Sequence, residues 1–193
     1  MTTNRSSSAL TESTAVARGR SLAVDIAREL GLVLAGAVAI ALIGQISLPL
    51  PFTPVPVTLG TFAALGVGGL LGSRRALASV GLFALAAALG VPVLEGWASG
   101  VGASFGYVLG YGLAAAIAGR ATSRTADGPR YSILVRLGLM LLASASVYVP
   151  GLIWLKAVTG VTWLTAVSIG VLPFIAGDVL KSVVASALPP RRG

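Results

Sequence analysis

The fold of this chain is decided around Gly69-Leu70-Leu71-Gly72-Ser73-Arg74-Arg75, where two arginines interrupt a long apolar sequence. The apolar segment 57–72 ends just before Ser73, and the apolar segment 76–92 begins just after Arg75. Two short apolar segments joined by only three polar residues predict a tight helical hairpin inside a membrane.

The composition agrees with a membrane protein. Hydrophobic residues make up 55% of the 193 residues, charged residues only 10%, and the mean hydropathy is +0.92. A soluble domain carries about 25% charged residues. The chain has no Cys and no His, which excludes disulfides and thiolate metal sites and removes the commonest base and metal ligand. With six acidic residues in all, no metal site and no conventional catalytic triad are expected.

Apolar segments long enough to approach the width of a bilayer recur along the chain. About 20 apolar residues span a bilayer. Six segments qualify, at roughly 30–50, 57–72, 76–92, 104–119, 133–155 and 165–188. The predicted fold is therefore all-α, a polytopic integral membrane protein with six transmembrane helices.

The arginines predict the orientation of these helices. All twelve fall on one side of a six-helix arrangement: Arg5, Arg18, Arg20, Arg28, Arg74, Arg75, Arg120, Arg124, Arg130, Arg136, Arg191 and Arg192. The opposite loops hold only Lys156 and Glu95. Positively charged loops stay in the cytoplasm, so both termini are predicted to be cytoplasmic. The net charge of +8 is explained in this way and does not indicate nucleic-acid binding.

Three regions follow from this topology. Residues 1–29 form a cytoplasmic N-terminal tail and the lead-in to the first helix, 30–188 the membrane domain, and 189–193 a cytoplasmic C-terminal tail. The first 20 residues are rich in Ser, Thr and Arg, so we expect a disordered or loosely attached tail that is not cleaved as a signal peptide.

Two loops on the predicted outer side have unusual compositions. Residues 47–56 contain four prolines and no charge, which excludes regular helix and predicts a stiff, extended, apolar loop. Residues 91–102 are rich in glycine and bend easily. Two interpretations stay open: the loops close together over a pocket, or both are simply short connections.

The last apolar segment carries two charges in Pro173-Phe174-Ile175-Ala176-Gly177-Asp178-Val179-Leu180-Lys181. A spacing of three places Asp178 and Lys181 on one face of a helix. Ionisable groups within a membrane face the bundle interior and mark a pathway or a ligand site. Composition alone leaves two roles open, a structural ion pair or a site for a small polar molecule such as a cyclic urea or an amide.

Two ladders of small residues predict close helix contacts. Gly102, Gly106 and Gly110 recur every four residues and are best explained by packing. Beside them, Ser104 and Tyr107 are candidates for polar contacts, whereas Tyr111 lies one turn deeper, where packing is the simpler role.

In the first helix, Gly31, Ala35 and Ala39 form a second ladder, next to a stripe with Ala37 and Ala41. Such a surface packs within the protein or docks a partner helix.

Five ordered blocks resemble the BioY family, the biotin-specific substrate-binding (S) components of energy-coupling factor (ECF) transporters. They are Val55-Pro56-Val57-Thr58-Leu59-Gly60-Thr61-Phe62, Gly69 to Arg75, Gly90-Val91-Pro92-Val93, Gly102 to Gly110, and Pro173 to Lys181. The resemblance covers roughly residues 30–188. It implies a six-helix fold with an outward-facing biotin pocket capped by the loop between the first two helices.

The resemblance also implies roles for individual residues. The family's Asp-x-x-Lys falls on Asp178 and Lys181, which are expected to contact biotin. Tyr107, Ser104, Thr58 and Ser99 complete the set of expected substrate-binding residues. Gly31, Ala35 and Ala39 are the expected docking face, because the family uses an Ala-rich stripe there.

Three positions depart from the family pattern. Gly60 stands where the family usually has Gln, so a polar contact is missing. Phe105 replaces a glycine and is expected to add bulk near the pocket, and Val108 stands where some members have a basic residue.

The predicted function is capture of biotin for ATP-driven uptake, in a prokaryotic plasma membrane. The chain is not expected to be an enzyme or to hold a cofactor. Its expected partners are an ECF transmembrane coupling protein and two ATPase subunits that use the ATP. Alternatives are a solitary proton-coupled transporter and an S component for a biotin-related vitamin. An intramembrane enzyme using Asp178 or Tyr107 is disfavoured by the absence of His.

Overall fold

The computed structural model describes residues 4–126 and 128–190, with side-chain surroundings from Leu22 onward except at position 128. The chain divides into two compact units, residues 1–32 and 33–193, and each is described by itself.

The first unit is helical. Helix α1 spans Asn4–Gly44, so its first part forms this unit. Our prediction that the helix begins near residue 30, after a disordered tail, was wrong. Residues 9–30 are rich in Ala, Leu, Glu and Arg and contain no proline, which favours helix over an irregular tail.

The second unit is a bundle of helices with two very short hairpins. After the last part of α1 its helices are α2 (Gly60–Leu71), α3 (Ser73–Ala88), α4 (Phe105–Ala121), α5 (Ile133–Ser146), α6 (Tyr148–Thr159), α7 (Trp163–Gly170) and α8 (Ile175–Ser186), with single 3-10 turns at Glu95–Trp97 and Leu172–Phe174. The antiparallel pairs are β1 (Ser47–Leu48) with β2 (Val57–Thr58), and β3 (Arg124–Thr125) with β4 (Gly128–Pro129).

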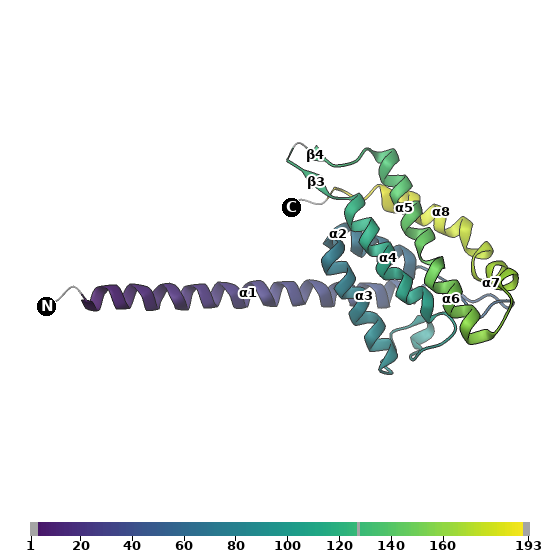
Figure 1. Cartoon of the computed structure of the whole chain (residues 1–193), viewed down its shortest axis with the longest axis horizontal. Coiled ribbons are helices and arrows are strands. Elements are labelled where there is room, and N and C mark those ends of the chain that lie inside the picture. Colours follow the sequence, from purple (N-terminus) through teal and green to yellow (C-terminus); the bar gives the residue numbers. More distant parts are fainter. Residues whose placement is uncertain (1–3, 127, 191–193) are drawn as a thin grey trace. The chain divides into compact units, whose positions relative to one another are not determined.

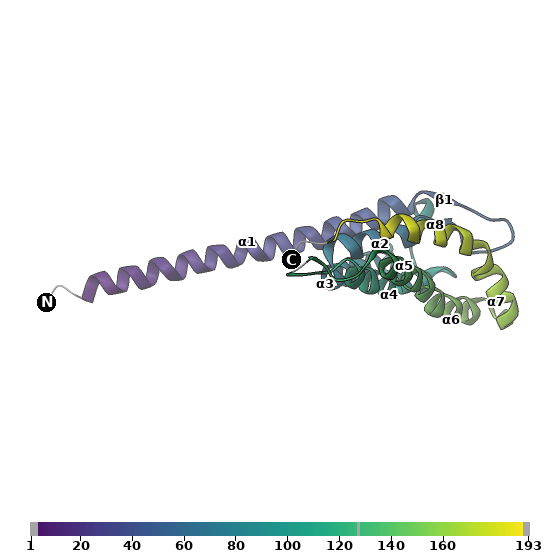
Figure 2. The same ribbon diagram turned by 90° about the horizontal axis from the view of Figure 1, so that it is seen from above.

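Helix α4 lies at the centre of this bundle. It packs against α2 and α3 on one side and α5 and α6 on the other, as Figure 1 and Figure 2 show. Helix α8 packs against α5 and α2. Small residues of α4, including Ala114, Ala115 and Ala118, are fully buried, which lets the neighbouring backbones approach closely.

Two of the predicted helices are each divided in two, and each division lies beside a proline. The segment 133–155 is α5 followed by α6, with Pro150 in the first turn of α6. The segment 165–188 is α7 and α8 separated by residues 171–174, which include Pro173. Proline has no backbone N–H and its ring clashes with the preceding turn, so a regular helix cannot run unchanged through it.

The helices carry an apolar surface suited to lipid. Three helical segments are long and apolar enough to cross a membrane, namely Leu22–Gly44, Ile133–Thr159 and Trp163–Ser186, and α2 is a shorter apolar helix. Large side chains such as Leu134, Leu164 and Leu180 are exposed on the outside of the helices. Because helices satisfy their own backbone hydrogen bonds, this architecture is stable in a bilayer. The all-α membrane fold is therefore confirmed.

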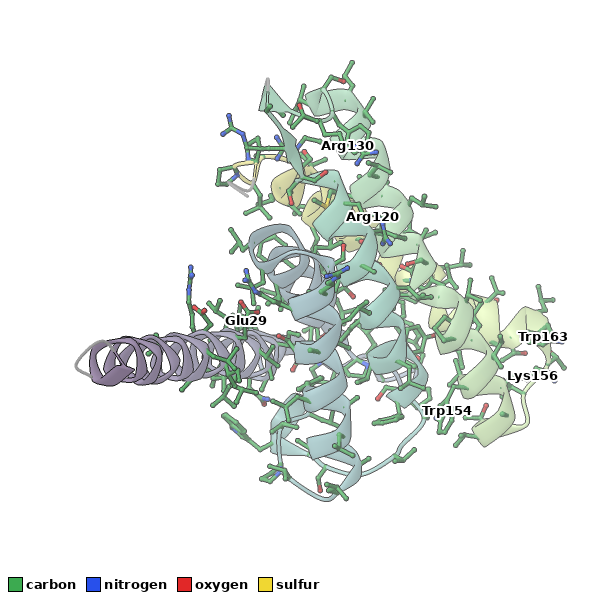
Figure 3. The ribbon with its side chains drawn as sticks, turned by 60° about the vertical axis from the view of Figure 1, so that its left-hand side comes forward. Glu29, Arg120, Arg130, Trp154, Lys156 and Trp163 are labelled. Carbon is green, nitrogen blue, oxygen red and sulfur yellow. The ribbon has the colours of Figure 1, made fainter. Side chains whose placement is uncertain are left out.

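The two ends of the bundle carry different side chains. Figure 3 shows Arg120 and Arg130 toward one end and Trp154, Lys156 and Trp163 toward the other. The Lys156 ammonium lies over the Trp163 ring, 5.3 Å from its centroid, so these two residues join α6 to the start of α7. Tryptophan is typical of membrane–water interfaces.

Candidate functional site

The two unusual loops lie together at one end of the second unit. The proline-rich loop is held at its base by β1 and β2, with Ser47 opposite Thr58. Gln45 joins it to the second loop: its amide donates to the carbonyl of Leu94 at 2.9 Å, and its side-chain oxygen accepts from the Trp97 N–H at 3.1 Å. Ser47 donates to the Glu95 carboxylate at 3.3 Å.

These loops cover a cavity of about 190 Å³ that is also lined by α1, α2, α3, α4, α6 and α8. A single water molecule needs roughly 10–15 Å³ of such space, so the cavity has room for a small molecule. Of the two interpretations left open for the loops, the structure favours closure over a pocket.

The cavity brings together every residue that we predicted to bind substrate. Its lining includes Thr58, Ser99, Ser104, Tyr107, Asp178 and Lys181. They come from β2, the glycine-rich loop, the start of α4 and α8, segments that lie far apart in the sequence.

The Asp178–Lys181 pair lies at the start of α8 because the helix is interrupted just before it. Phe174 N–H donates to the carbonyl of Val171 instead of continuing the α-helical pattern, and α8 begins at Ile175. Asp178 therefore lies in the first turn of α8, where the helix dipole stabilises a negative charge, and Lys181 follows one turn later. A membrane helix that breaks where it lines a cavity is common in binding sites of transporters.

Both charges are buried and hydrogen bonded. Asp178 and Lys181 are each 8% exposed, and Lys181 Nζ lies 3.0 Å from Asp178 Oδ1. Tyr148 of α6 donates its hydroxyl to Asp178 Oδ2, and Lys181 Nζ donates to the carbonyl of Thr58 at 2.8 Å. An unpaired charge at this depth would be costly, so the pair and its partners stabilise each other.

The pair keeps hydrogen-bonding capacity toward the cavity. A lysine ammonium has three N–H donors and a carboxylate has about four acceptor positions. The contacts of Lys181 within the described residues use two donors, and those of Asp178 use one acceptor position on each oxygen. A ligand that offers both N–H donors and a carbonyl acceptor matches what is left.

Aromatic side chains form an apolar wall beside the pair. The ring of Tyr107 lies 6.5 Å from the rings of both Tyr148 and Phe174, measured between centroids. The Tyr107 hydroxyl donates to the carbonyl of Gly170 at 2.9 Å, a group that the interruption after α7 leaves outside the helical pattern. Tyr107 therefore holds the end of α7 in place and presents its ring to the cavity.

Gly60 is required by the position of Tyr111. A Cβ atom at Gly60 would lie 2.3 Å from the Tyr111 hydroxyl oxygen and 2.8 Å from Cζ, closer than side chains tolerate. The Tyr111 hydroxyl lies 3.5 Å from Thr58 Oγ1 and lines the cavity. The polar group beside Gly60 is therefore the Tyr111 hydroxyl of α4, and not a side chain of α2. Tyr111, for which packing was the simpler role, therefore also presents its hydroxyl to the cavity.

Gly60→Ala is therefore expected to lower the stability of the protein by about 1–3 kcal/mol, the usual range for overpacking a core. Tyr111→Phe in the same chain should recover part of the loss, because it removes the nearest atom. Thermal unfolding in detergent measures both. Gly66→Ala, in the same helix, is the matched control because its added Cβ meets nothing within 4 Å. Equal melting temperatures for Gly60→Ala and Gly66→Ala would contradict the assignment.

Phe105 does not narrow the cavity, contrary to our expectation. Its ring packs on Trp154 of α6 with 5.9 Å between centroids, and Phe105 is not part of the lining. The glycines that follow Phe105 allow α4 to lie this close to α6. A Cβ at Gly106 would lie 2.2 Å from Trp154 Cβ, and one at Gly110 would lie 2.8 Å from Val147 Cα, so the packing role of these two glycines is confirmed.

The small residues of α1 divide between two faces. Ala37 and Ala41 are buried in the bundle. Gly31 and Ala35 are exposed and Ala39 is half-buried. Ala35, which belongs to the expected docking ladder, is therefore not used in packing within the bundle.

Sequence reasoning did not assign four polar residues of the cavity to the site: Thr61, Glu95, Tyr111 and Tyr148. A tyrosine hydroxyl within an apolar segment is a signal for Tyr148, but its partner Asp178 lies 30 residues away. Glu95 stands out in the sequence only as a charge in an outer loop.

Comparisons with known proteins agree with this geometry. A model of the BioY family matches residues 9–192. The chain is 30% identical to "Biotin transporter BioY2" of Lactococcus lactis subsp. cremoris over 70% of this chain and 75% of that protein. It is 32% identical to "Probable biotin transporter BioY" of Pyrococcus horikoshii, over 76% and 85% of the two chains.

A solved structure has the same fold. The crystal structure of the S-component for biotin from an ECF-type ABC transporter superimposes with a TM-score of 0.71 at 28% identity, and the match covers 84% of this chain and 88% of that one. With a family match over nearly the whole sequence and a shared fold, this chain belongs to the BioY family.

Proposed function

We propose that this chain is the membrane subunit that captures biotin for an ECF-type transporter, and that the cavity beneath the two loops is its biotin site. The observation that carries the proposal is the buried Asp178–Lys181 pair, which lines the cavity with unused donors and acceptors. As a member of BioY the chain is a transport protein and not an enzyme.

The ureido ring of biotin fits the chemistry of the pair. Asp178 accepts the ureido N–H groups, and Lys181 donates to the ureido oxygen. The rings of Tyr107, Tyr148 and Phe174 then cover the apolar part of the bicycle. Thr58, Ser99 and Ser104 offer hydroxyl groups along the rest of the ligand.

The same proposal includes six membrane crossings with both termini in the cytoplasm, in a prokaryotic plasma membrane. The separation of Arg120 and Arg130 from Trp154, Lys156 and Trp163 supports it (Figure 3). The cavity lies under loops that this orientation places outside the cell, where the vitamin arrives.

The partners proposed for uptake are a transmembrane coupling protein and two ATPases. Similarity to an S-component of an ECF-type ABC transporter supports a complex of this kind. The exposed side of α1 around Ala35 is proposed as the docking surface.

Equilibrium titration of the purified protein tests the proposed ligand. We expect biotin and desthiobiotin to bind, and lipoate to bind at least about 100-fold more weakly, because lipoate has the acid tail and a sulfur ring but no ureido group to meet Asp178 and Lys181. Equal binding of biotin and lipoate would contradict the assignment, and tight binding of another vitamin alone would favour the biotin-related alternative.

A further inference from the structure

Among the described residues, the charges that line the cavity leave no cation for the acid tail of a ligand. Within the described part of the chain, the charged residues of the lining are Lys181, Asp178 and Glu95. They contribute one positive and two negative formal charges. The cavity is therefore negative by one charge before any ligand enters.

Lys181 is not available to a carboxylate. Its ammonium lies 3.0 Å from Asp178 Oδ1 and 2.8 Å from the carbonyl oxygen of Thr58, so its charge is already neutralised. A ligand carboxylate placed there would also lie next to the carboxylate of Asp178, and like charges at such distances repel strongly at low dielectric.

Two further positive groups near the cavity, Lys156 and the start of α4, are engaged in other contacts. Lys156 does not line the cavity: it donates to the carbonyl of Val161 and lies over the Trp163 ring (Figure 3). At the start of α4, Phe105 N–H donates to the carbonyl of Gly102 and Tyr107 N–H to that of Ser104, which reduces the donors that the helix offers to an anion.

The rest of the outer lining is neutral or acidic. Ser99 and Ser104 present hydroxyl groups, which carry no charge and can donate to a carboxylate, an ester or an amide. Glu95 is half-buried in the loop that covers the cavity and accepts a hydrogen bond from Ser47. A carboxylate at the loop disfavours a second one in the ligand and does not disfavour a neutral tail.

We propose that this cavity recognises the ureido ring and does not select for the free acid, so that ureido compounds with a neutral tail, such as biotin amides and esters, are ligands in their own right. Glu95 is the residue that sets this preference. The inference rests on the proposed function, since it assumes that the ureido ring lies against Asp178 and Lys181.

The test is competition of biotin, biotin methyl ester and biotinamide for the purified protein at pH 7 and low salt. The amide and the ester are expected to bind at least as tightly as biotin. In Glu95→Gln, biotin should gain about 3-fold or more relative to the amide, because Gln keeps the size and the acceptor for Ser47 but removes the charge. Asp25→Asn is the control for losing one acidic charge, since Asp25 is exposed and outside the lining.

A second variant adds the missing cation. Val108 lines the cavity, so Val108→Lys should favour biotin over its amide by about 10-fold or more, and binding of the amide reports that the variant is folded. Biotin binding more than 10-fold tighter than the amide in the parent, or an unchanged ratio in Glu95→Gln, would overturn the inference alone. If none of the three compounds binds the parent, the proposed function itself fails and the inference fails with it.

Discussion

Asp178→Asn is expected to weaken biotin binding by about 10- to 100-fold, and it also lowers stability because it leaves Lys181 buried without its anion. Hydrogen bonds to a charged group contribute about 1.5–3 kcal/mol, and each 1.4 kcal/mol is a factor of ten in affinity. The amide keeps the shape of the carboxyl group, so the loss reports its charge and its acceptor positions. Isothermal titration gives the change in Kd, and Lys156→Met serves as the control because Lys156 is a cation outside the cavity lining.

A pair of further variants separates a ligand site from a purely structural ion pair. Lys181→Met leaves Asp178 buried without its cation, which is expected to lower stability by about 3–5 kcal/mol. Combining it with Asp178→Asn removes both charges and should recover most of the melting temperature without recovering biotin binding. Parent-like biotin affinity in the double variant would show that the pair is structural and would contradict the site.

Ala35→Trp is expected to abolish assembly with the coupling protein and ATP-driven biotin uptake, while biotin binding to the isolated subunit stays unchanged. Ala35 is exposed, whereas Ala37 and Ala41 on another face of α1 are buried. Helices that associate in membranes rely on close approach over small residues, and an indole ring prevents it. Co-purification with the coupling protein and ATPases, and uptake into vesicles with ATP inside, measure the two effects.

Ala145→Trp is the matched control for this variant. Ala145 is an exposed alanine on α5, so the same bulk is added to another outward-facing helix. Normal assembly of Ala35→Trp would contradict the proposed docking surface. Uptake that proceeds without the ATPases would instead favour the solitary proton-coupled transporter.

Much of the fold follows from patterns that are local in the sequence. Apolar segment lengths located all six predicted helical regions, and the prolines of residues 47–56 excluded helix there. The divisions beside Pro150 and Pro173 were not predicted, although both prolines are visible, because a proline can also be accommodated by a kink without a break. The early start of α1 differs from the prediction because the helix propensity of residues 9–30 outweighs the polar composition of the tail.

Some residues of the candidate site can likewise be recognised from the sequence, and others cannot. Asp178 and Lys181 are recognisable because charges are rare in apolar segments, and the structure places both in the cavity. Tyr148 and Tyr111 reach the same cavity only through the packing of α6 and α4, which the sequence spacing does not reveal. The effect of Gly60 depended on where the Tyr111 hydroxyl lies, a contact across 51 residues of sequence.

The most direct test of the central claim is an experimental structure of the protein with biotin bound. We predict the ureido ring in the cavity beneath the loops, with its N–H groups within hydrogen-bonding distance of Asp178 and its oxygen within that distance of Lys181. Biotin bound outside this cavity, or inside it with the ureido ring turned away from both residues, would contradict the claim.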